Sequence, residues 1–415
     1  MPQTLSFSQL VSNLSLAQFQ YNMPFIMTSD RSFEPDFMDQ TYQPGSTVNI
    51  RKVNQYIGQR GRILVPRDTI EETVPLTIGE EYGNAIAFNS KELTLEVTKA
   101  APKYQERYVQ PVVQNLAATL ERDIMDSAVL DLNYFSGSPT ALISDFALVD
   151  IVDAQMTELA MPKQDDMSFV LGPRDASALK ASNQNAFNPT LNEDISFKSQ
   201  LGRYSNFQMY TSPATVIHQA GSGAGTPVVS VVPVSGATTI SMSGFTPSAT
   251  GVLLAGDTIT FGTFGTNGAV ESVNPVTRDS TGQLMPFTVQ ADVNADGSGN
   301  AVVTISPAII SDPANPRRNV NQNIPLNAPV NLLGAGLKYR ISVAYTSRAL
   351  SLVMPPLTRV HAPECGVAVD RETGISLRVT IGFDMVNGID MTRIEFLAGF
   401  KWHQQYAIKL ISAAN

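Results

Sequence analysis

Between residues 104 and 131, apolar side chains recur at every third or fourth position, which is the spacing of one helix face. Glu121, Arg122 and Asp123 stand between apolar positions, as expected for an amphipathic helix. The pattern predicts one helix about 40 Å long at about 1.5 Å per residue, kinked near Pro111. The apolar positions are Val109, Val112, Val113, Leu116, Leu120 and Ile124.

Further elements follow. A second helix is predicted from Ser144, as its cap, to just before Pro162, with one apolar face. Residues 169–171 read as a short buried strand, and Pro173 is well placed to begin a third helix. The second helix's apolar face comprises Phe146, Val149, Val152, Met156 and Leu159.

The clearest strand pattern lies near the carboxyl end, where apolar and polar residues alternate from Ile375 to Phe383. The dipeptide Asn387-Gly388 predicts a type I′ hairpin turn into a second strand over 391–397. A last strand is expected to hold Tyr406, Ile408 and Leu410. Helical and strand patterns alternate irregularly, so the fold class is α+β.

Two segments are expected to project from the body. Residues 1–31 mix polar and scattered apolar positions and predict an extended arm with a short helix. Residues 42–75 carry glycines and prolines between the β-like runs 47–50 and 63–65, which indicates a long two-stranded loop.

Residues 221–340 form a separate module. They hold 15 of the chain's 28 glycines and only 11 charged residues. Their short β-branched runs, separated by turn residues, predict a small antiparallel barrel or sandwich inserted into the main domain. The runs are 228–232, 258–261, 287–289 and 302–305.

Composition excludes several classes of function. The chain has 415 residues, enough for two or three domains, and its net charge of −9 gives no basis for tight binding to nucleic acid phosphates. One cysteine, Cys365, allows neither an intrachain disulfide nor a multi-thiolate metal site, and suits a reducing cytoplasm. Without a signal-peptide pattern or a long apolar run, neither secretion nor a membrane span is expected.

Residues that could carry chemistry have simpler interpretations. Asp292, Asn294, Asp296 and Gly297 match the start of a calcium loop, but Val303 replaces its final glutamate, so a hairpin turn is favoured. Other candidates are interpreted as structural: the glycines as a linker, Cys365 as an incidental thiol, and the histidines as surface or packed residues, with His403 paired to Trp402 at a core edge. They are Gly221, Gly223, Gly225, Cys365, His218, His361 and His403.

Two groups of charged residues could each bind a partner. Arg317-Arg318 could touch an anion, although a solvated loop is the commoner role of such a pair. The acidic residues Asp30, Glu34, Asp36 and Asp39 could dock a basic partner segment, although they are usually only solvating charge. We therefore predict no catalytic residue, no cofactor-binding residue and no metal ligand.

The order of segments resembles the tailed-phage major capsid (coat) proteins of the Hong Kong ninety-seven-type fold, in the short-tailed subgroup with an inserted β domain. The most specific matches are "GDTITF" at 256–261, "VNPVTRDSTGQLMPFTV" at 273–289 and "ADGSGNAVVTISPAI" at 295–309. Weaker ones are "LTIGEEYGNAIAF" at 76–88 and "LRVTIGFDMVNGIDMTRIEFLAGFKW" at 377–402.

The resemblance implies a domain plan over nearly the whole chain. It assigns an N-terminal arm to 1–31, and a peripheral domain to 32–139 and 371–415 that includes the extended β loop 42–78 and a long spine helix at 100–135. It assigns an axial domain to 140–220 and 341–370, and an inserted small antiparallel β-barrel domain to 221–340.

The resemblance also implies a function without an active site. Such subunits form pentamers and hexamers that close into an icosahedral shell around double-stranded DNA, assembled in the host cytoplasm with a scaffolding protein and a portal complex. A net negative charge suits weak, non-specific contact with packaged DNA. Removal of residues 1–31 is then expected to leave the body folded but to block shell closure.

Two other classes remain open. The glycine-rich β module fits a virion decoration or adhesion protein, but such proteins are typically all-β, which the long helix opposes. An enzyme, such as a hydrolase, has only chain length and a few acidic clusters in its favour.

Overall fold

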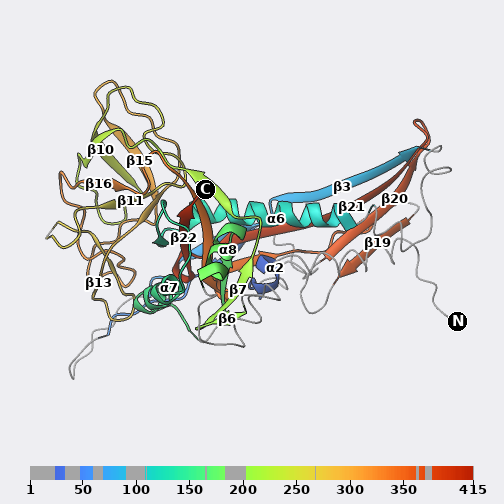
Figure 1. The fold of residues 1–415 in the computed structure, drawn as a ribbon, viewed down its shortest axis with the longest axis horizontal. Coiled ribbons are helices and arrows are strands. Elements are labelled where there is room, and N and C mark those ends of the chain that lie inside the picture. Colours follow the sequence, from blue (N-terminus) through green and yellow to red (C-terminus); the bar gives the residue numbers. More distant parts are fainter. Residues whose placement is uncertain are drawn as a thin grey trace. The chain divides into compact units, whose positions relative to one another are not determined.

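The computed structural model describes residues 24–32, 47–58, 69–89, 108, 110–163, 166–182, 202–266, 268–360, 364–369 and 376–414. It is a sheet-rich α+β structure (Figure 1). The chain divides into two compact units. The first unit comprises Met1–Ile50, Thr73–Ile124 and Leu350–Lys401, and the second comprises Arg51–Glu72, Met125–Ala349 and Trp402–Asn415. No helix in the described ranges is both long and apolar enough to span a lipid bilayer.

The first unit is built on a five-stranded sheet. Its longest strand, β21, pairs antiparallel with β20 on one side and with β3 on the other, and Figure 1 shows these three strands side by side. The strands are β18 (Leu350–Val353), β21 (Ile389–Trp402), β20 (Ser376–Asp384), β19 (Glu364–Val369) and β3 (Glu80–Asn89).

Helix α6 (Gln110–Asp131) contributes its first part to this unit and its last turns to the other. The apolar face expected from the sequence is buried, as at Val113, Leu116 and Leu120. In the first unit, the hydroxyl of Tyr82 donates a hydrogen bond of 2.8 Å to the Asp123 carboxylate of this helix. The expected start near residue 104 lies outside the described residues.

The hairpin between β20 and β21 differs from the sequence prediction. Asp384 pairs with Ile389, so the loop has four residues, and only Gly388 has a positive φ (64°). A type I′ turn needs positive φ at both central residues, so that prediction is wrong. Instead, the Asp384 carboxylate accepts hydrogen bonds from the Asn387 side chain and from the backbone N–H groups of Val386 and Asn387. These bonds lower the pKa of Asp384 from its ordinary value.

Helix α2 (Pro24–Thr28) belongs to the core of the first unit. Phe25 and Ile26 are buried, and the backbone of Asp30 bridges to the strand β18 through Leu350 and Leu352. A truncation of residues 1–31 would remove these core side chains, so a truncation that tests the arm alone must keep residues 24–31. Residues 1–23 lie outside the described residues.

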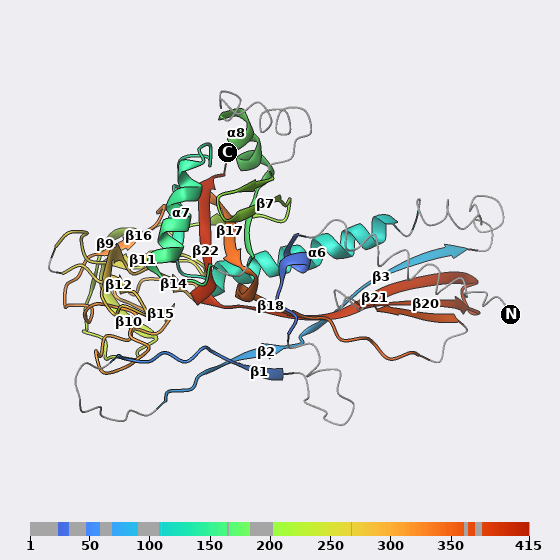
Figure 2. The same ribbon diagram turned by 90° about the horizontal axis from the view of Figure 1, so that it is seen from below.

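A two-stranded ribbon, β1 (Thr47–Arg51) and β2 (Thr73–Thr77), forms the base of the expected projecting loop (Figure 2). Ile50 and Leu76 pack with Val353 of β18. The expected strand at 63–65 lies outside the described residues.

The second unit contains a seven-stranded sheet with two helices against it. Helices α7 (Ala147–Glu158) and α8 (Pro173–Ser182) pack buried side chains such as Met156 and Leu179 on the sheet. The strands are β4 (Phe135–Gly137), β22 (Ala407–Ala413), β17 (Lys338–Thr346), β5 (Met167–Leu171), β7 (Phe207–Thr211) and β6 (Arg203–Tyr204), with β8 (Val216–Gln219) paired to β17.

Strand pairing departs from the expected domain plan at two places. The final strand β22 pairs with β17 and β4 of this sheet, and does not complete the sheet that contains β20 and β21. The expected axial segment 341–370 is divided, because β18 and β19 pair within the first unit's sheet. The predicted cap Ser144 is also wrong: Asp145 accepts the hydrogen bond from the Ala147 N–H.

Residues 225–332 form a six-stranded antiparallel sheet that closes on itself, here called the barrel. The sheet order is β16-β11-β14-β15-β10-β9, and Val228 of β9 bridges to Pro329, beside β16. A hairpin, β12–β13, extends from it, and one apolar cluster fills the interior. The strands are β9 (Gly225–Val229), β10 (Thr239–Phe245), β11 (Thr258–Phe261), β12 (Glu271–Val273), β13 (Ser280–Leu284), β14 (Phe287–Val289), β15 (Ala301–Ser306) and β16 (Val330–Leu332).

Candidate functional site

The last turn of α6 ends against polar side chains from the barrel. The final carbonyl groups of a helix have no partner within it and must be satisfied from elsewhere. Here Gln290 donates to the Leu130 carbonyl (2.9 Å) and Thr288 donates to the Leu132 carbonyl (2.6 Å). The barrel thus completes the hydrogen bonding of the helix end.

The contact between the end of α6 and the barrel is here called the junction. Lys409, on β22, lies in this junction and is fully buried. Its ammonium nitrogen donates to the Thr258 hydroxyl (3.0 Å), the Thr288 hydroxyl (3.4 Å) and the Val129 carbonyl (3.4 Å). Desolvation lowers the pKa of Lys409 to about 7, and the negative charge of Asp257 partly opposes this effect. The helix dipole favours a cation at the C-terminal end of a helix. The end of α6 therefore favours the charged form of Lys409, whereas burial opposes it.

Asp257 fixes the chain segment through which the barrel joins the sheet. One carboxylate oxygen lies 2.8 Å from Nε2 of His218, and the other accepts from the backbone N–H groups of Gly221 (3.0 Å) and Leu254 (2.7 Å). Asp257 is fully buried and His218 nearly so, which is the satisfied arrangement that buried polar groups require. Gly221 is thus a tightly held connection between β8 and β9.

Gly256 explains the close approach of the barrel to α6. Its φ is 96°, and a Cβ atom there would lie 2.4 Å from the Val129 side chain and 3.2 Å from His218. Any other residue would be strained by this backbone conformation and would push the barrel away from the helix.

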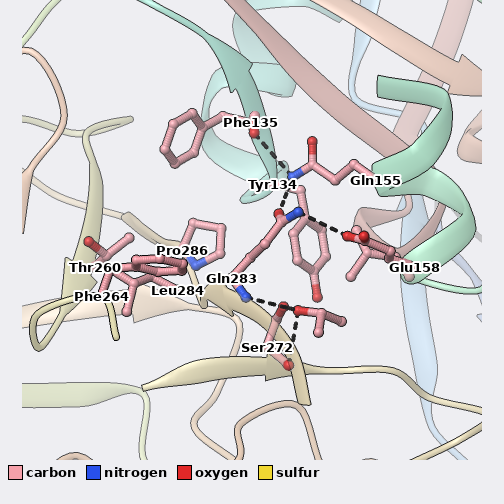
Figure 3. Close-up of a pocket in the computed structure, with 12 residues that line it drawn as sticks. Tyr134, Phe135, Gln155, Glu158, Thr260, Phe264, Ser272, Gln283, Leu284 and Pro286 are labelled. Atoms are coloured by element: carbon pink, nitrogen blue, oxygen red, sulfur yellow. Dashed lines mark hydrogen bonds between the residues drawn. The ribbon is translucent and has the colours of Figure 1, made fainter. Parts of the chain in front are cut away.

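A cleft of about 320 Å³ lies where α7 meets the β12–β13 hairpin (Figure 3). Its polar groups bind one another: Gln283 donates to the Glu158 carboxylate (2.9 Å), and Gln155 donates to the Gln283 side chain (3.3 Å). Burial raises the pKa of Tyr134, which also lines the cleft. The cleft therefore presents a polar seam that is already hydrogen-bonded, beside the exposed ring of Phe264.

The residues considered for calcium binding hold turns. Asp292 and Asn294 accept backbone N–H groups of Ala255 and Gly251, and Asp296 accepts those of Ser298 and Asn300. The loop joins the paired strands β14 and β15, as predicted, but it spans residues 290–300 and is longer than the tight hairpin turn that was expected. Among the described residues, no group of three or more His, Cys, Asp or Glu side chains is placed to hold a metal ion.

Other candidates have structural surroundings. Cys365 is half-buried on β19, where the Thr380 hydroxyl approaches its sulfur at 3.9 Å. Trp402 is buried against Tyr345, and the neighbouring His403 donates its backbone N–H to Ala349, which agrees with a core edge. His361, Glu34, Asp36 and Asp39 lie outside the described residues.

Arg317 and Arg318 are not a solvated loop. Arg317 is only 7% exposed and faces the Glu72 carboxylate at 3.5 Å. Arg318 donates to the carbonyls of Val320 and Asn321. The anion that Arg317 contacts therefore belongs to the chain itself.

In the first unit, the sheet continues beyond its buried core. The hairpin between β20 and β21 exposes large apolar side chains: Phe383 is 57%, Met385 88% and Val386 92% exposed. Nearer the core, Arg378 pairs with Glu395, which also contacts Arg393, so cross-strand ion pairs hold the sheet.

The sequence did not indicate the junction at the end of α6. Lys409 alternates with Ile408 and Leu410, a pattern that ordinarily places the lysine in solvent. One signal was present at Asp257: it is a rare charge in a charge-poor module and directly precedes a buried strand.

No protein-family model matches the chain, and no curated protein matches its sequence. Solved structures are similar in backbone. A structure of Mycobacterium phage Che8 is 11% identical, covers 93% of this chain and 90% of its own, and gives a TM-score of 0.47. The capsid of Ralstonia phage GP4 is 8% identical over 93% and 87% of the two chains (TM-score 0.45), and the capsid of cyanophage P-SCSP1u is 7% identical over 90% and 85% (TM-score 0.40). The chain is thus similar to phage capsid structures over about nine tenths of its length.

Proposed function

We propose that the chain is a structural shell subunit, the major capsid protein of a tailed phage. Copies would form pentamers and hexamers that close into an icosahedral shell around double-stranded DNA. The observation that carries the proposal is the β20–β21 hairpin, which extends past its core with Phe383, Met385 and Val386 exposed. Exposed neighbouring apolar groups of this size mark a protein contact surface.

The described residues that follow β1 also expose apolar side chains. Val53 and Tyr56, which follow β1, are 58% and 67% exposed. Projecting elements of this kind gain buried area only when they lie on a neighbouring copy, and repeated copies of one contact generate a closed symmetric assembly. Self-association would therefore bury the exposed apolar side chains of both the β20–β21 hairpin and the residues that follow β1.

The proposed domain plan follows the strand pairing. The first unit, with α6 as the spine helix, is the peripheral domain, and the seven-stranded sheet with α7 and α8 is the axial domain. The barrel is the inserted domain. We place the protein in the virion capsid, as a non-enzymatic subunit assembled in the host cytoplasm, with a scaffolding protein and a portal complex as partners and DNA bound only weakly.

A virion decoration or adhesion protein is the second candidate. The barrel exposes Val231, Val232, Val234 and Leu326, which would suit a binding face. The helices α6, α7 and α8 are unusual for that class, which is typically all-β.

Electron microscopy distinguishes the two functions. The chain is expressed alone and with lysate that contains its phage neighbours, then imaged by negative stain and sedimented. Closed shells or ring-shaped capsomers are expected. A monomer that persists in both conditions would contradict the capsid function and favour the second candidate.

The double variant Phe383→Ser/Met385→Ser is expected to leave the free subunit folded. It should lower the yield of closed shells at least about tenfold, because each copy loses apolar contact area. The yield is measured by sedimentation. Val302→Ser, at a barrel residue that is 67% exposed, is the matched control. An equal loss of shells in the control would contradict a specific role for the hairpin.

Removal of residues 1–23 is expected to retain α2 and a folded subunit while preventing shell closure, if the arm joins neighbouring copies. Circular dichroism checks folding, and sedimentation checks assembly. Normal shells from this truncation would refute the arm assignment.

A further inference from the structure

The described stretches 51–58 and 69–72, here together called the extended segment, are joined by two contacts. The Lys52 N–H donates to the Glu72 carbonyl (2.9 Å), and the Lys52 ammonium lies 3.0 Å from the Glu72 carboxylate. Both ends of the segment therefore meet at one carboxylate.

Arg317 of the barrel binds the same place. Its guanidinium lies 3.5 Å from the Glu72 carboxylate oxygen that Lys52 also contacts, and it donates to the Ile70 carbonyl at 3.4 Å. The arginine side chain is only 5% exposed, whereas that of Glu72 is 38% exposed. An arginine buried to this degree needs its partners, because an unpaired buried charge is strongly unfavourable.

The barrel loop that carries Arg317 is itself fixed. The Arg317 N–H donates to the Asn315 side chain, and Arg278 donates to the carbonyls of Asn315 and Pro316. Arg318 donates hydrogen bonds to the carbonyls of Val320 and Asn321. Arg317 is thus presented on a rigid base rather than on a freely moving loop.

We propose that the barrel holds the base of the extended segment through Arg317 and Glu72, and so sets the direction in which that segment leaves the subunit. This inference rests on the proposed function for its biological meaning. A segment fixed before it meets a neighbouring copy loses less conformational entropy on contact, so assembly is favoured. The barrel would then act as an orienting element for shell contacts.

Hydrogen–deuterium exchange of the unassembled full-length chain tests the contact. The variants are Glu72→Gln, which keeps the shape of a half-exposed side chain, Arg317→Met, and the double variant. Loss of a charged hydrogen bond is expected to speed exchange over residues 51–58 and 69–77 on the order of tenfold, with peptides of β5 and β17 unchanged. Arg203→Met, at an exposed arginine of β6, is the control and should exchange like the wild type.

The double variant should speed exchange by less than the two single effects combined, because both changes break the Arg317–Glu72 contact. Each change also breaks one contact of its own, Lys52–Glu72 or Arg317–Ile70. Wild-type exchange rates in both single variants would overturn the proposal, as would additive effects in the double variant. The capsid function fails separately, through the absence of particles from the wild-type chain in electron microscopy. Where shells do form, Glu72→Gln should slow their closure without reducing the amount of soluble subunit.

Discussion

Lys409→Met is expected to abolish a rise in stability that we expect of the wild-type chain between pH 7 and about 9.5. Lys409 is fully buried, and its pKa in the folded chain is lowered to about 7. In the unfolded chain, a lysine keeps its ordinary pKa of about 10.4. The wild type should gain roughly 3 kcal/mol over this window, at up to about 1.4 kcal/mol per pH unit.

The direction follows from proton binding. Between the two pKa values, the unfolded chain holds the Lys409 proton and the folded chain does not, so raising the pH favours the folded chain. Below pH 7 both states hold the proton, and the whole cost of burying the ammonium is present. The pKa values of Tyr134 and Tyr339 are raised by burial, so they reduce stability only above about pH 10, outside the window.

Urea unfolding at several pH values measures this slope for the wild type and the variant. Lys163→Met is the control, because that lysine is partly exposed and pairs with Asp153 at 3.0 Å. The control should keep the wild-type slope. An unchanged slope in Lys409→Met would show that another group causes the pH dependence.

Asp257→Ala is expected to destabilise the chain by about 3–5 kcal/mol, because several hydrogen-bonding groups lose their partner at about 1–3 kcal/mol each. The change leaves His218 and the N–H groups of Gly221 and Leu254 without their acceptor, and removes the negative charge that favours the Lys409 ammonium. Unfolding in urea at neutral pH measures the loss. Asp279→Ala, at an exposed barrel residue, should cost less than about 0.5 kcal/mol.

The Asp257→Ala/Lys409→Met double variant measures the interaction between the Asp257 and Lys409 side chains. Because Asp257 partly offsets the burial of Lys409, the double variant should be less destabilised than the sum of the single changes. Strict additivity would show that the two groups do not interact.

Local patterns in the sequence predicted much of the secondary structure. The face of α6 at Val113, Leu116 and Leu120 is buried as expected, and strands β11 and β14 occupy the expected residues. These elements follow from hydrophobic spacing, which depends only on neighbours along the chain. Helix α8 begins at Pro173, as the fixed φ of proline predicts.

Contacts between distant residues could not be predicted in this way. The final strand β22 pairs with β17 and β4, which lie far from it in the sequence. The turn at Asn387-Gly388 differs for a local reason, because the nearby Asp384 carboxylate binds the loop. Lys409 is held by Thr258 and Thr288, more than a hundred residues earlier. Such partners become neighbours only through the fold, so a local pattern places the lysine in solvent.

The two ends of the barrel segment leave and return side by side, because β8 and β17 pair at Gln219 and Lys338. A different domain could therefore be spliced at this point without stretching the body. The graft would fail unless it also supplied acceptors for Lys409 and donors for the carbonyls of Leu130 and Leu132. Exchange of this domain during evolution is thus permitted by the backbone but restricted by a few buried polar atoms.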